Sequence, residues 1–244
     1  MSAHAGRRLA LVFAHPDDET FAVGATVARY AHEGVHVALF CATDGNAGVS
    51  SSVPVGSPEE LATIRRNELL SAARHLGIRD VVTAGHPDKG LAALDPEALT
   101  GDIVAFLRHA QPDVVITFGP EGAPTGHPDH RALSRAATAA FFLAGLPTEF
   151  PQAGTPHRAA RLYYATFYPP KPDAELQRVG LPPTARLDAR PWLPRKREAF
   201  LVHATQRVHQ PRFEELAATD EEWYTLASGI PQLDDVVSDL FEGL

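Results

Sequence analysis

Residues 9–19, which read Leu-Ala-Leu-Val-Phe-Ala-His-Pro-Asp-Asp-Glu, join an apolar run to a histidine and three carboxylates. The run Leu9–Ala14 is typical of a buried strand, and Pro16 is well placed to open a helix. In an open α/β sheet, the side chains at the carboxyl end of a strand line the crevice where ligands bind. This stretch therefore predicts the first strand of the fold and one side of its site.

A second cluster of the same kind follows another apolar run. Residues 127–130 read His-Pro-Asp-His, and they come shortly after the run Asp113–Phe118. Here too, histidine and aspartate lie beyond the end of an expected strand. Because two such strand ends can converge on one ion, the sequence predicts a metal site built from both clusters.

Apolar runs alternate with helical spacing along the first two-thirds of the chain. The expected helices are Glu19–Glu33, Pro58–Leu76, Pro96–Ala110 and His127–Ala144. The expected strands are Leu9–Ala14, Val35–Cys41, Asp80–Ala84, Asp113–Phe118 and Arg161–Phe167. This alternation predicts an α/β fold with a Rossmann-like, doubly wound, mostly parallel sheet of about five strands and helices on both faces.

Proline marks a change in the last third of the chain. Ten of the 21 prolines fall between Pro147 and Pro194, so this Pro-rich stretch is expected to be irregular and to lie over the sheet without extending it. Helical spacing returns in residues 195–203, in residues 212–218 and near the C-terminus.

We expect a single domain over residues 1–244, with an α/β core over residues 1–168 and a C-terminal covering segment over residues 169–244. Two loops, Asp44–Ser57 and Gly119–Gly126, are candidate walls of a pocket.

Composition and charge limit the classes of function. The net charge of −8, without a block of lysine and arginine, argues against a nucleic-acid partner. The single cysteine, Cys41, excludes an intrachain disulfide framework and a Cys-rich zinc site, so a metal must be held by histidine and carboxylate. The run Leu9–Ala14 is too short for a signal peptide or a membrane span, which predicts a cytoplasmic protein without a membrane partner.

Spacing within the two clusters indicates which side chains bind the metal. His15 and Asp18 are three residues apart, so they share a face of a first helical turn. With His130 they form a set of two histidines and one carboxylate, which leaves open positions for water as a catalytic site requires. Zinc can bring the pKa of that water to about 7.

The other polar residues of the clusters fit hydrolysis of an amide or ester. Asp17 lies beside the expected ligands and is the natural general base. His127, protonated and steadied by Asp129, can donate to the oxyanion of a tetrahedral intermediate. The three residues are therefore expected to be catalytic.

These motifs also resemble those of a known family. Ala14–Glu19 and Gly126–His130 are similar to the two hallmark motifs of the PIG-L/LmbE-like zinc-dependent N-acetylglucosaminyl de-N-acetylases. Three further matches extend the resemblance to roughly residues 7–206: Arg65-x-x-Glu68 with Leu76-Gly77, the turn Pro87-Asp88-Lys89-Gly90, and Lys196-x-x-Ala199-x-x-x-His203-x-Thr205-Gln206.

The resemblance implies a zinc-dependent enzyme that removes the acetyl group from N-acetylglucosamine attached to an aglycone. It assigns the metal to His15, Asp18 and His130, the general base to Asp17, and stabilisation of the intermediate to His127. It leaves the aglycone of this small-molecule sugar conjugate open among malate, inositol, a lipid-linked inositol and a peptide antibiotic.

The resemblance further implies that Arg65 and Asp88 contact the sugar or aglycone, and that the protein forms a homo-oligomer, a trimer or hexamer. Zinc and ferrous iron both remain candidates for the native metal, because the affinity order alone does not decide occupancy. Some thiol-cofactor deacetylases of the family have tyrosine where this chain has Thr125, which weakens any transfer of their substrate preference.

Other interpretations of the same residues lead to different functions. An amidase acting on another acyl or cysteinyl conjugate would use the same site. Two histidines and one carboxylate also describe the site of non-haem iron oxygenases, but those enzymes do not need a base such as Asp17. A nucleotide-binding module is disfavoured because no Gly-x-Gly-x-x-Gly follows the first strand. A catalytically inactive sugar-binding module is disfavoured because a base, ligands and an oxyanion partner are all present.

Several polar residues outside the two clusters are expected to have supporting roles. His86 lies in a third His-Pro-Asp, and we expect it to line the pocket without binding metal. Glu19 is expected to lie behind the ligands. His203 and Lys196 are expected to close the C-terminal segment on the sheet.

Overall fold

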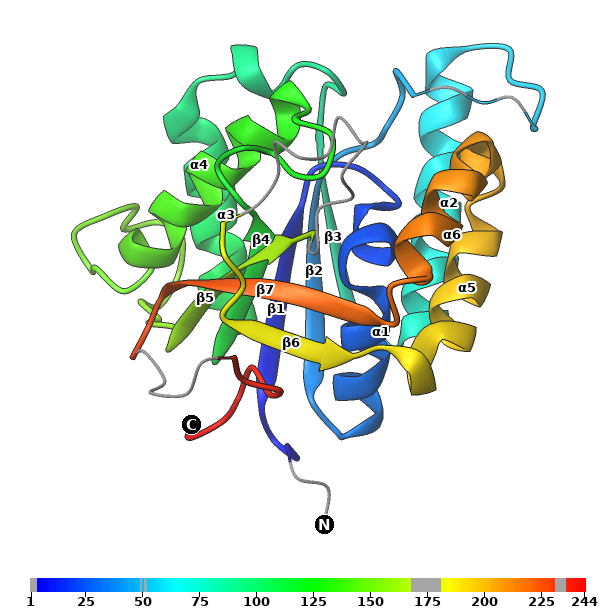
Figure 1. The fold of residues 1–244 in the computed structure, drawn as a ribbon. Coiled ribbons are helices and arrows are strands. Elements are labelled where there is room, and N and C mark those ends of the chain that lie inside the picture. Colours follow the sequence, from blue (N-terminus) through cyan, green and yellow to red (C-terminus); the bar gives the residue numbers. More distant parts are fainter. Residues whose placement is uncertain (1–3, 49, 51, 168–180, 231–235) are drawn as a thin grey trace.

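The computed structural model of the protein describes residues 4–48, 50, 52–167, 181–230 and 236–244, which form one seven-stranded sheet with helices on both faces. The strand order is β3-β2-β1-β4-β5-β7-β6 (Figure 1). The first five strands of that order run parallel, whereas β7 is antiparallel to β5 and β6 is antiparallel to β7.

The bounds of the elements follow the chain. The strands are β1 (Arg8–Phe13), β2 (His36–Thr43), β3 (Asp80–His86), β4 (Val114–Phe118), β5 (Arg161–Thr166), β6 (Ala185–Asp188) and β7 (Glu221–Ser228). The α-helices are α1 (Asp18–His32), α2 (Pro58–Leu76), α3 (Pro96–Ala110), α4 (Pro128–Leu143), α5 (Leu193–Val202) and α6 (Gln210–Ala217). Short 3-10 helices are η1 (Leu91–Ala93), η3 (Arg190–Trp192) and η4 (Ala204–His209).

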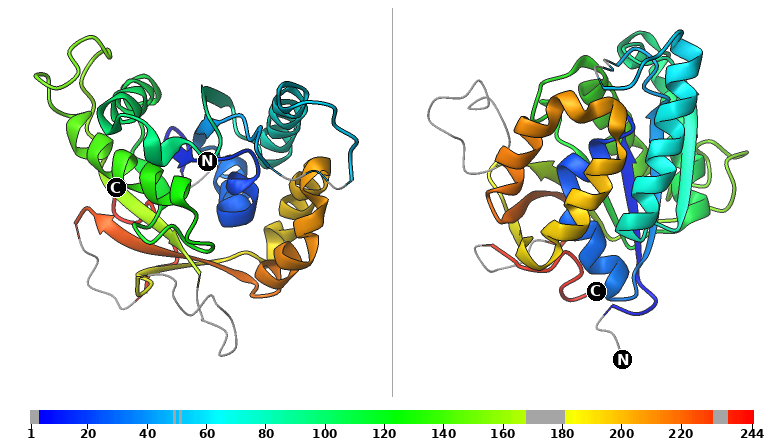
Figure 2. Two further views of the ribbon diagram at one scale, coloured as in Figure 1. Left: turned by 90° about the horizontal axis from the view of Figure 1, so that it is seen from above. Right: turned by 90° about the vertical axis from the view of Figure 1, so that its right-hand side faces the viewer.

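The centre of the sheet is buried on both faces. Every residue of β4 and all but the first of β1 are buried, which is why these strands are nearly continuous apolar runs. Helices α3 and α4 pack on each other over one face, and α1, α2 and α5 cover the other (Figures 1 and 2). In the described part of the chain, no helix has the length and apolarity to cross a membrane.

The direction of chain winding reverses between β1 and β4. From β1 the chain moves outward to β2 and β3, then returns to pair β4 against the other edge of β1. The carboxyl ends of two strands at such a reversal border the crevice in which open α/β sheets bind ligands. The two His-Pro-Asp clusters at residues 15 and 127 follow these two strands.

The elements expected in the first two-thirds are confirmed with small shifts at their ends. Helices α2 and α3 have the expected bounds because their ends are encoded locally. Ser57 caps α2 by accepting from the Glu60 amide, and Gly77 ends it in the left-handed conformation at φ 80°. Asp95 caps α3 in the same way as Ser57 caps α2, and both helices have proline in the first turn.

The expectation that the Pro-rich stretch lies over the sheet without extending it is wrong at β6. This strand pairs with β7, and the two carry the sheet beyond β5, which raises the strand number from about five to seven. The helices expected at residues 195–203 and 212–218 are present as α5 and α6. The expected boundary between residues 168 and 169 lies outside the described residues.

Strand β7 also completes helix α1. The helix is interrupted at Val23 (φ −140°), so the amides of Ala25 and Thr26 lack their usual helical acceptors. Both amides donate to the carboxylate of Glu222, at 3.0 and 2.7 Å. The buried ammonium of Lys196 on α5 donates to the same carboxylate at 2.7 Å. The C-terminal elements therefore fasten the helix that follows the first cluster.

Candidate metal centre and active site

Three side chains predicted as metal ligands meet at the carboxyl ends of β1 and β4. The Nδ1 atom of His15 lies 3.3 Å from Nε2 of His130. The two carboxylate oxygens of Asp18 lie 3.4 Å from these nitrogens, Oδ2 from His15 and Oδ1 from His130. Around a tetrahedral ion with ligand bonds of about 2.0–2.1 Å, ligand atoms are about 3.3–3.4 Å apart. The spacing of the two ring nitrogens therefore fits a small divalent cation, and the Asp18 carboxylate lies beside both rings with one oxygen facing each.

The far side of the His15 ring faces two more carboxylates. Its Nε2 lies 3.2 Å from Oδ1 of Asp88 and 3.3 Å from Oδ2 of Asp129. Carboxylates in this position fix the tautomer and orientation of a metal-binding histidine. Although burial raises the pKa values of these two carboxyl groups, contact with His15 holds them below the usual value.

Backbone amides hold both carboxylates in place. Asp129 accepts from the amides of Lys89 and Leu91 at 2.7 and 3.1 Å, and its side chain is fully buried. Asp88 accepts from the Ala47 amide at 3.0 Å, with 4% of its side chain exposed. Asp129 therefore faces His15 through its carboxylate and contacts His127 through its backbone amide. Asp88 likewise faces His15, whereas it was expected to face a sugar.

The His130 ring is oriented by stacking. It lies on the Phe118 ring at a centroid distance of 4.1 Å and an interplanar angle of 9°. Its Nδ1 atom is buried without a hydrogen-bond partner among the described residues. The strand that ends at Phe118 thus aims the ring, and Nε2 points toward His15 and Asp18.

His127 also lies at this centre, and its hydrogen bonding separates it from the three ligands. One of its ring nitrogens lies within 4.8 Å of those of His15 and His130, close enough for a common ion. However, Nδ1 accepts from the Asp129 amide at 3.2 Å, which places the proton of a neutral ring on Nε2. Burial and the nearby His15 and His130 lower the pKa of His127. In this tautomer Nε2–H is a hydrogen-bond donor, so a neutral ring can also serve as the expected donor to an oxyanion.

Asp17 is the N-cap residue of α1, and its backbone has an uncommon conformation. Its φ of 121° lies in the region that favours glycine. The backbone amide donates to Oε2 of Glu19 at 3.0 Å, and the carbonyl accepts from the amides of Thr20 and Phe21. Burial raises the pKa of the Asp17 carboxyl to about 6, although the Arg65 charge acts in the opposite direction. This value lies in the range suited to a general base near neutral pH.

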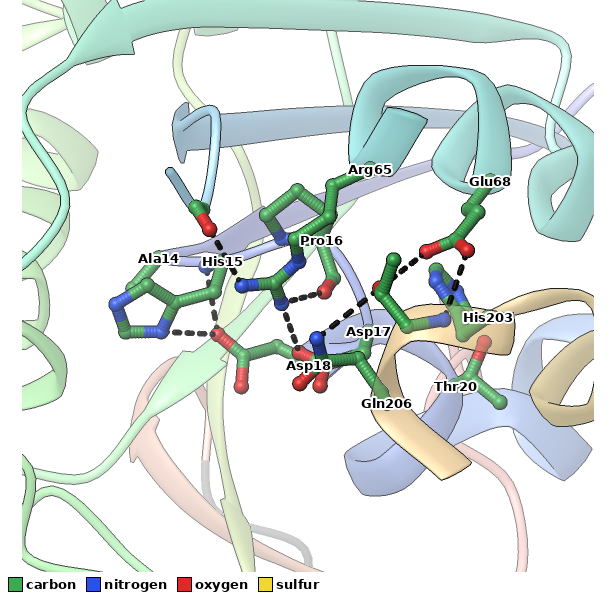
Figure 3. Close-up of polar contacts among 12 residues, drawn as sticks. Ala14, His15, Pro16, Asp17, Asp18, Thr20, Arg65, Glu68, His203 and Gln206 are labelled. Atoms are coloured by element: carbon green, nitrogen blue, oxygen red, sulfur yellow. Dashed lines mark hydrogen bonds and ion pairs between the residues drawn. The ribbon is translucent and has the colours of Figure 1, made fainter. Parts of the chain in front are cut away.

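Arg65 on α2 lies behind Asp17 and is nearly fully buried. Its guanidinium donates to the carbonyls of Pro16 and Gly45, at 2.6 and 2.9 Å, and lies 3.5 Å from the Asp17 carboxylate (Figure 3). A Cβ atom at Gly45 or at Gly48 would overlap this guanidinium. The structure thus places Arg65 against the backbone of the turn between β1 and α1 and against the loop Asp44–Ser57. The resemblance implied that Arg65 contacts the sugar or aglycone.

The loop Asp44–Ser57 borders a cavity, as expected. The cavity has a volume of about 570 Å³, and its lining runs from Asn46 to Leu61. Gly48 contributes to this lining and also packs against Arg65. His86, in contrast, contacts Asp102 on α3 at 2.8 Å, away from the metal-site ligands.

Comparison with known proteins places the chain in a family. A family model described as PIG-L, GlcNAc-PI de-N-acetylase, matches residues 10–141, which is more than half of the chain. The chain belongs to the PIG-L family. The matched segment of this PIG-L protein contains both His-Pro-Asp clusters, so the resemblance seen in the motifs is confirmed.

Relatives of this PIG-L protein are named as deacetylases. One from Rhodococcus opacus (strain B4), 1D-myo-inositol 2-acetamido-2-deoxy-alpha-D-glucopyranoside deacetylase, is 35% identical, with 88% of this chain and 87% of the relative covered. Another from Bacillus anthracis, probable N-acetyl-alpha-D-glucosaminyl L-malate deacetylase 2, is 32% identical, with 82% and 81% covered. The solved structure of N,N'-diacetylchitobiose deacetylase from Pyrococcus horikoshii has the same fold, with a TM-score of 0.75 at 23% identity over 92% of this chain and 84% of the other.

Proposed function

We propose that the protein is a metal-dependent N-deacetylase that hydrolyses the acetamide of an N-acetylglucosaminyl conjugate. The observation that carries this proposal is the convergence of His15, Asp18 and His130, whose two ring nitrogens lie 3.3 Å apart and each 3.4 Å from one oxygen of Asp18, beside the partly buried carboxylate of Asp17. The family and the names of the relatives support the reaction class.

The donor set suits zinc or ferrous iron, because both bind imidazole nitrogen together with carboxylate oxygen. His15, Asp18 and His130 would hold the ion, and Asp88 and Asp129 would orient the first of these ligands. When bound, a divalent ion supplies a Lewis acid that polarises a carbonyl and lowers the pKa of water.

Asp17 transfers the proton in this reaction, and His127 donates a hydrogen bond. As the oxygen of water forms its bond to the acetyl carbon, the Asp17 carboxylate takes the proton that leaves the water. The Nε2–H of His127 donates to the carbonyl oxygen while negative charge develops there. The C–N bond then breaks, the sugar nitrogen receives the proton from Asp17, and acetate and a free amine are the products.

Arg65 acts on the reaction through Asp17. Its charge lowers the pKa of the Asp17 carboxyl and so opposes the effect of burial, and its two hydrogen bonds fix the carbonyls of Pro16 and Gly45. We therefore assign Arg65 and Asp88 to positioning, with the sugar contacts made elsewhere in the crevice.

For the substrate, we propose a small N-acetylglucosaminyl conjugate with a polyhydroxylated aglycone. The Rhodococcus relative is named for an inositol conjugate, and the cavity along the Asp44–Ser57 loop is of a size for such a ring. Its lining includes serine and asparagine side chains that can bind hydroxyl groups.

Acetate release tests the proposal directly. The substrates are N-acetylglucosaminyl conjugates of inositol and of malate, with N-acetylglucosamine alone and a cysteinyl amide for comparison, each with metal-loaded and chelator-stripped protein. We expect metal-dependent acetate release that is fastest with the inositol conjugate. Cleavage of the cysteinyl amide alone would identify another amidase, and no cleavage with one metal bound per chain would contradict the deacetylase assignment.

A further inference from the structure

A chain of hydrogen bonds runs from the C-terminal segment to the backbone of Asp17. His203, directly after α5, donates from Nε2 to Oε1 of Glu19 at 2.9 Å. The other oxygen of Glu19 accepts from the Asp17 amide at 3.0 Å. The side chains of His203 and Glu19 are 0% and 1% exposed, so neither group exchanges its partner for water.

The buried carboxylate of Glu19 is held in place by hydrogen bonds. A buried charge without a partner is costly, and Glu19 lies beside Asp17 and Asp18, which repel it. Thr20 donates a second hydrogen bond to Oε1 at 2.6 Å, but it brings no charge. His203 contacts this carboxylate from a distant part of the chain, whereas the Asp17 amide and Thr20 are its neighbours in sequence. Glu19 raises the pKa of His203, although burial acts in the opposite direction.

The path of hydrogen bonds from His203 ends at Asp17, which has a strained backbone conformation. Asp17 holds a φ of 121°, and such conformations persist only where surrounding contacts determine them. Its amide is directed at Glu19, so the orientation of the peptide, and with it the position of the Asp17 carboxylate, depends on where Glu19 is held.

We propose that His203 is a positioning residue that holds the general base Asp17 through Glu19. This inference rests on the proposed function for its effect on turnover. The C-terminal segment thereby takes part in the reaction, because it fixes the position of the Asp17 carboxylate. His203 and Glu19, which make this contact, are 184 residues apart in the sequence.

A second contact of the same segment serves as a matched control; Figure 3 labels its partner Glu68 beside His203. Glu68 on α2 binds Thr205, two residues after His203, with Oε1 accepting from the amide at 2.9 Å and Oε2 from the hydroxyl at 2.6 Å. This pair fastens the same segment without contacting Glu19. Thr205→Val therefore loosens the segment and leaves the path to Asp17 intact.

Two substitutions of His203, by glutamine and by asparagine, test the proposal because their side-chain amides differ in length. The nitrogen of glutamine can take the place of Nε2, whereas asparagine is one bond shorter and cannot reach Glu19. We expect His203→Asn to lower kcat at least tenfold, with KM and bound metal within twofold of the wild type. His203→Gln should recover most of the activity. Thr205→Val should lower the thermal midpoint and retain kcat.

Amide hydrogen exchange of Asp17, measured by NMR on zinc-loaded protein, gives a readout that does not depend on activity. Exchange should be at least tenfold faster in His203→Asn and near the wild-type rate in His203→Gln. Glu19→Gln keeps the volume and should show the same acceleration, which preserves the test if the asparagine variant does not fold.

Unchanged kcat and unchanged exchange in His203→Asn would overturn the proposal. If kcat falls in step with the thermal midpoint in His203→Asn, His203→Gln and Thr205→Val alike, His203 has a structural role only. If the wild-type protein releases no acetate, the proposed function fails, and the exchange rates still decide whether His203 positions Asp17.

Discussion

At the scale of single residues, the backbone of Asp17 places its carboxylate. A residue at φ 121° costs about 1–3 kcal/mol relative to a relaxed conformation. Glycine would accept this φ at lower cost, but it has no carboxylate to take a proton. The strain is therefore retained at a position where the side chain has a chemical use.

Replacement of this carboxylate separates catalysis from metal binding. We expect Asp17→Asn to lower kcat by about 10²–10⁴, because the amide cannot accept the proton from water. Metal content should stay at one ion per chain, since His15, Asp18 and His130 are unchanged. Deacetylation rates and metal analysis of the purified variant check this, and activity near the wild-type level would remove Asp17 as the base.

The side chain of His127 offers a second test. Its Nδ1 accepts from the Asp129 amide, so we expect it to act as a donor through Nε2. His127→Ala should lower kcat by about 10²–10³ and leave the metal in place. His127→Gln, which keeps a donor near that position, should lose less. Loss of the metal in the alanine variant would make His127 a ligand instead.

Which residues meet at the centre could be predicted, but not all of their partners. His15, Asp18 and His130 come together because they follow neighbouring parallel strands, a relation visible in the motif spacing. The contacts of Asp88 and Asp129 with His15 depend on the amides of two distant loops. No local pattern reveals such contacts.

At the scale of elements, the ends of helices were easier to predict than the pairing of strands. Caps and prolines mark α2 and α3 within a few residues. β7 contains Trp223, Tyr224 and Thr225, residue types that favour strands and a signal that was available. Its place between β5 and β6 depends on pairing with residues 33–66 positions away in the sequence, so the sequence pattern does not predict its role in the sheet.

The buried pair Lys196–Glu222 is expected to stabilise this arrangement of elements. Its side chains are 4% and 5% exposed, and Glu222 also caps the second part of α1. Lys196→Met should lower the free energy of unfolding by about 3–5 kcal/mol, because it leaves the carboxylate buried without its countercharge. Arg197→Met, which removes the neighbouring, partly exposed pair with Glu214, is the control in denaturant unfolding and should have a much smaller effect. Equal effects would contradict the structural role of the buried pair.

At the scale of the whole molecule, the metal centre joins segments that begin more than 110 residues apart. The proposed ligands His15 and Asp18 lie before and at the start of α1, and the third, His130, lies in the first turn of α4. An ion that binds only the folded chain stabilises it by an amount that grows with the logarithm of the ratio of free ion concentration to Kd. The formation of a trimer or hexamer stays a prediction.

Removal of the metal should therefore lower stability as well as activity. At a free ion concentration 100 times Kd, the gain in unfolding free energy is about 2.7 kcal/mol. Thermal unfolding with and without added zinc should show a higher midpoint when zinc is present. His86→Ala should keep this shift and the metal, whereas His15→Ala should abolish both. A shift lost in His86→Ala would mean that the ligand set is wrong.

The packing of Gly45 and Gly48 against Arg65 has a consequence for redesign of the enzyme. Any side chain at these two positions displaces the guanidinium that steadies the base, so a library that varies the whole loop would consist mostly of inactive clones. Diversity confined to residues 52–55, which line the same cavity, leaves that anchor intact. The preference for the aglycone of the substrate can then be evolved separately from turnover.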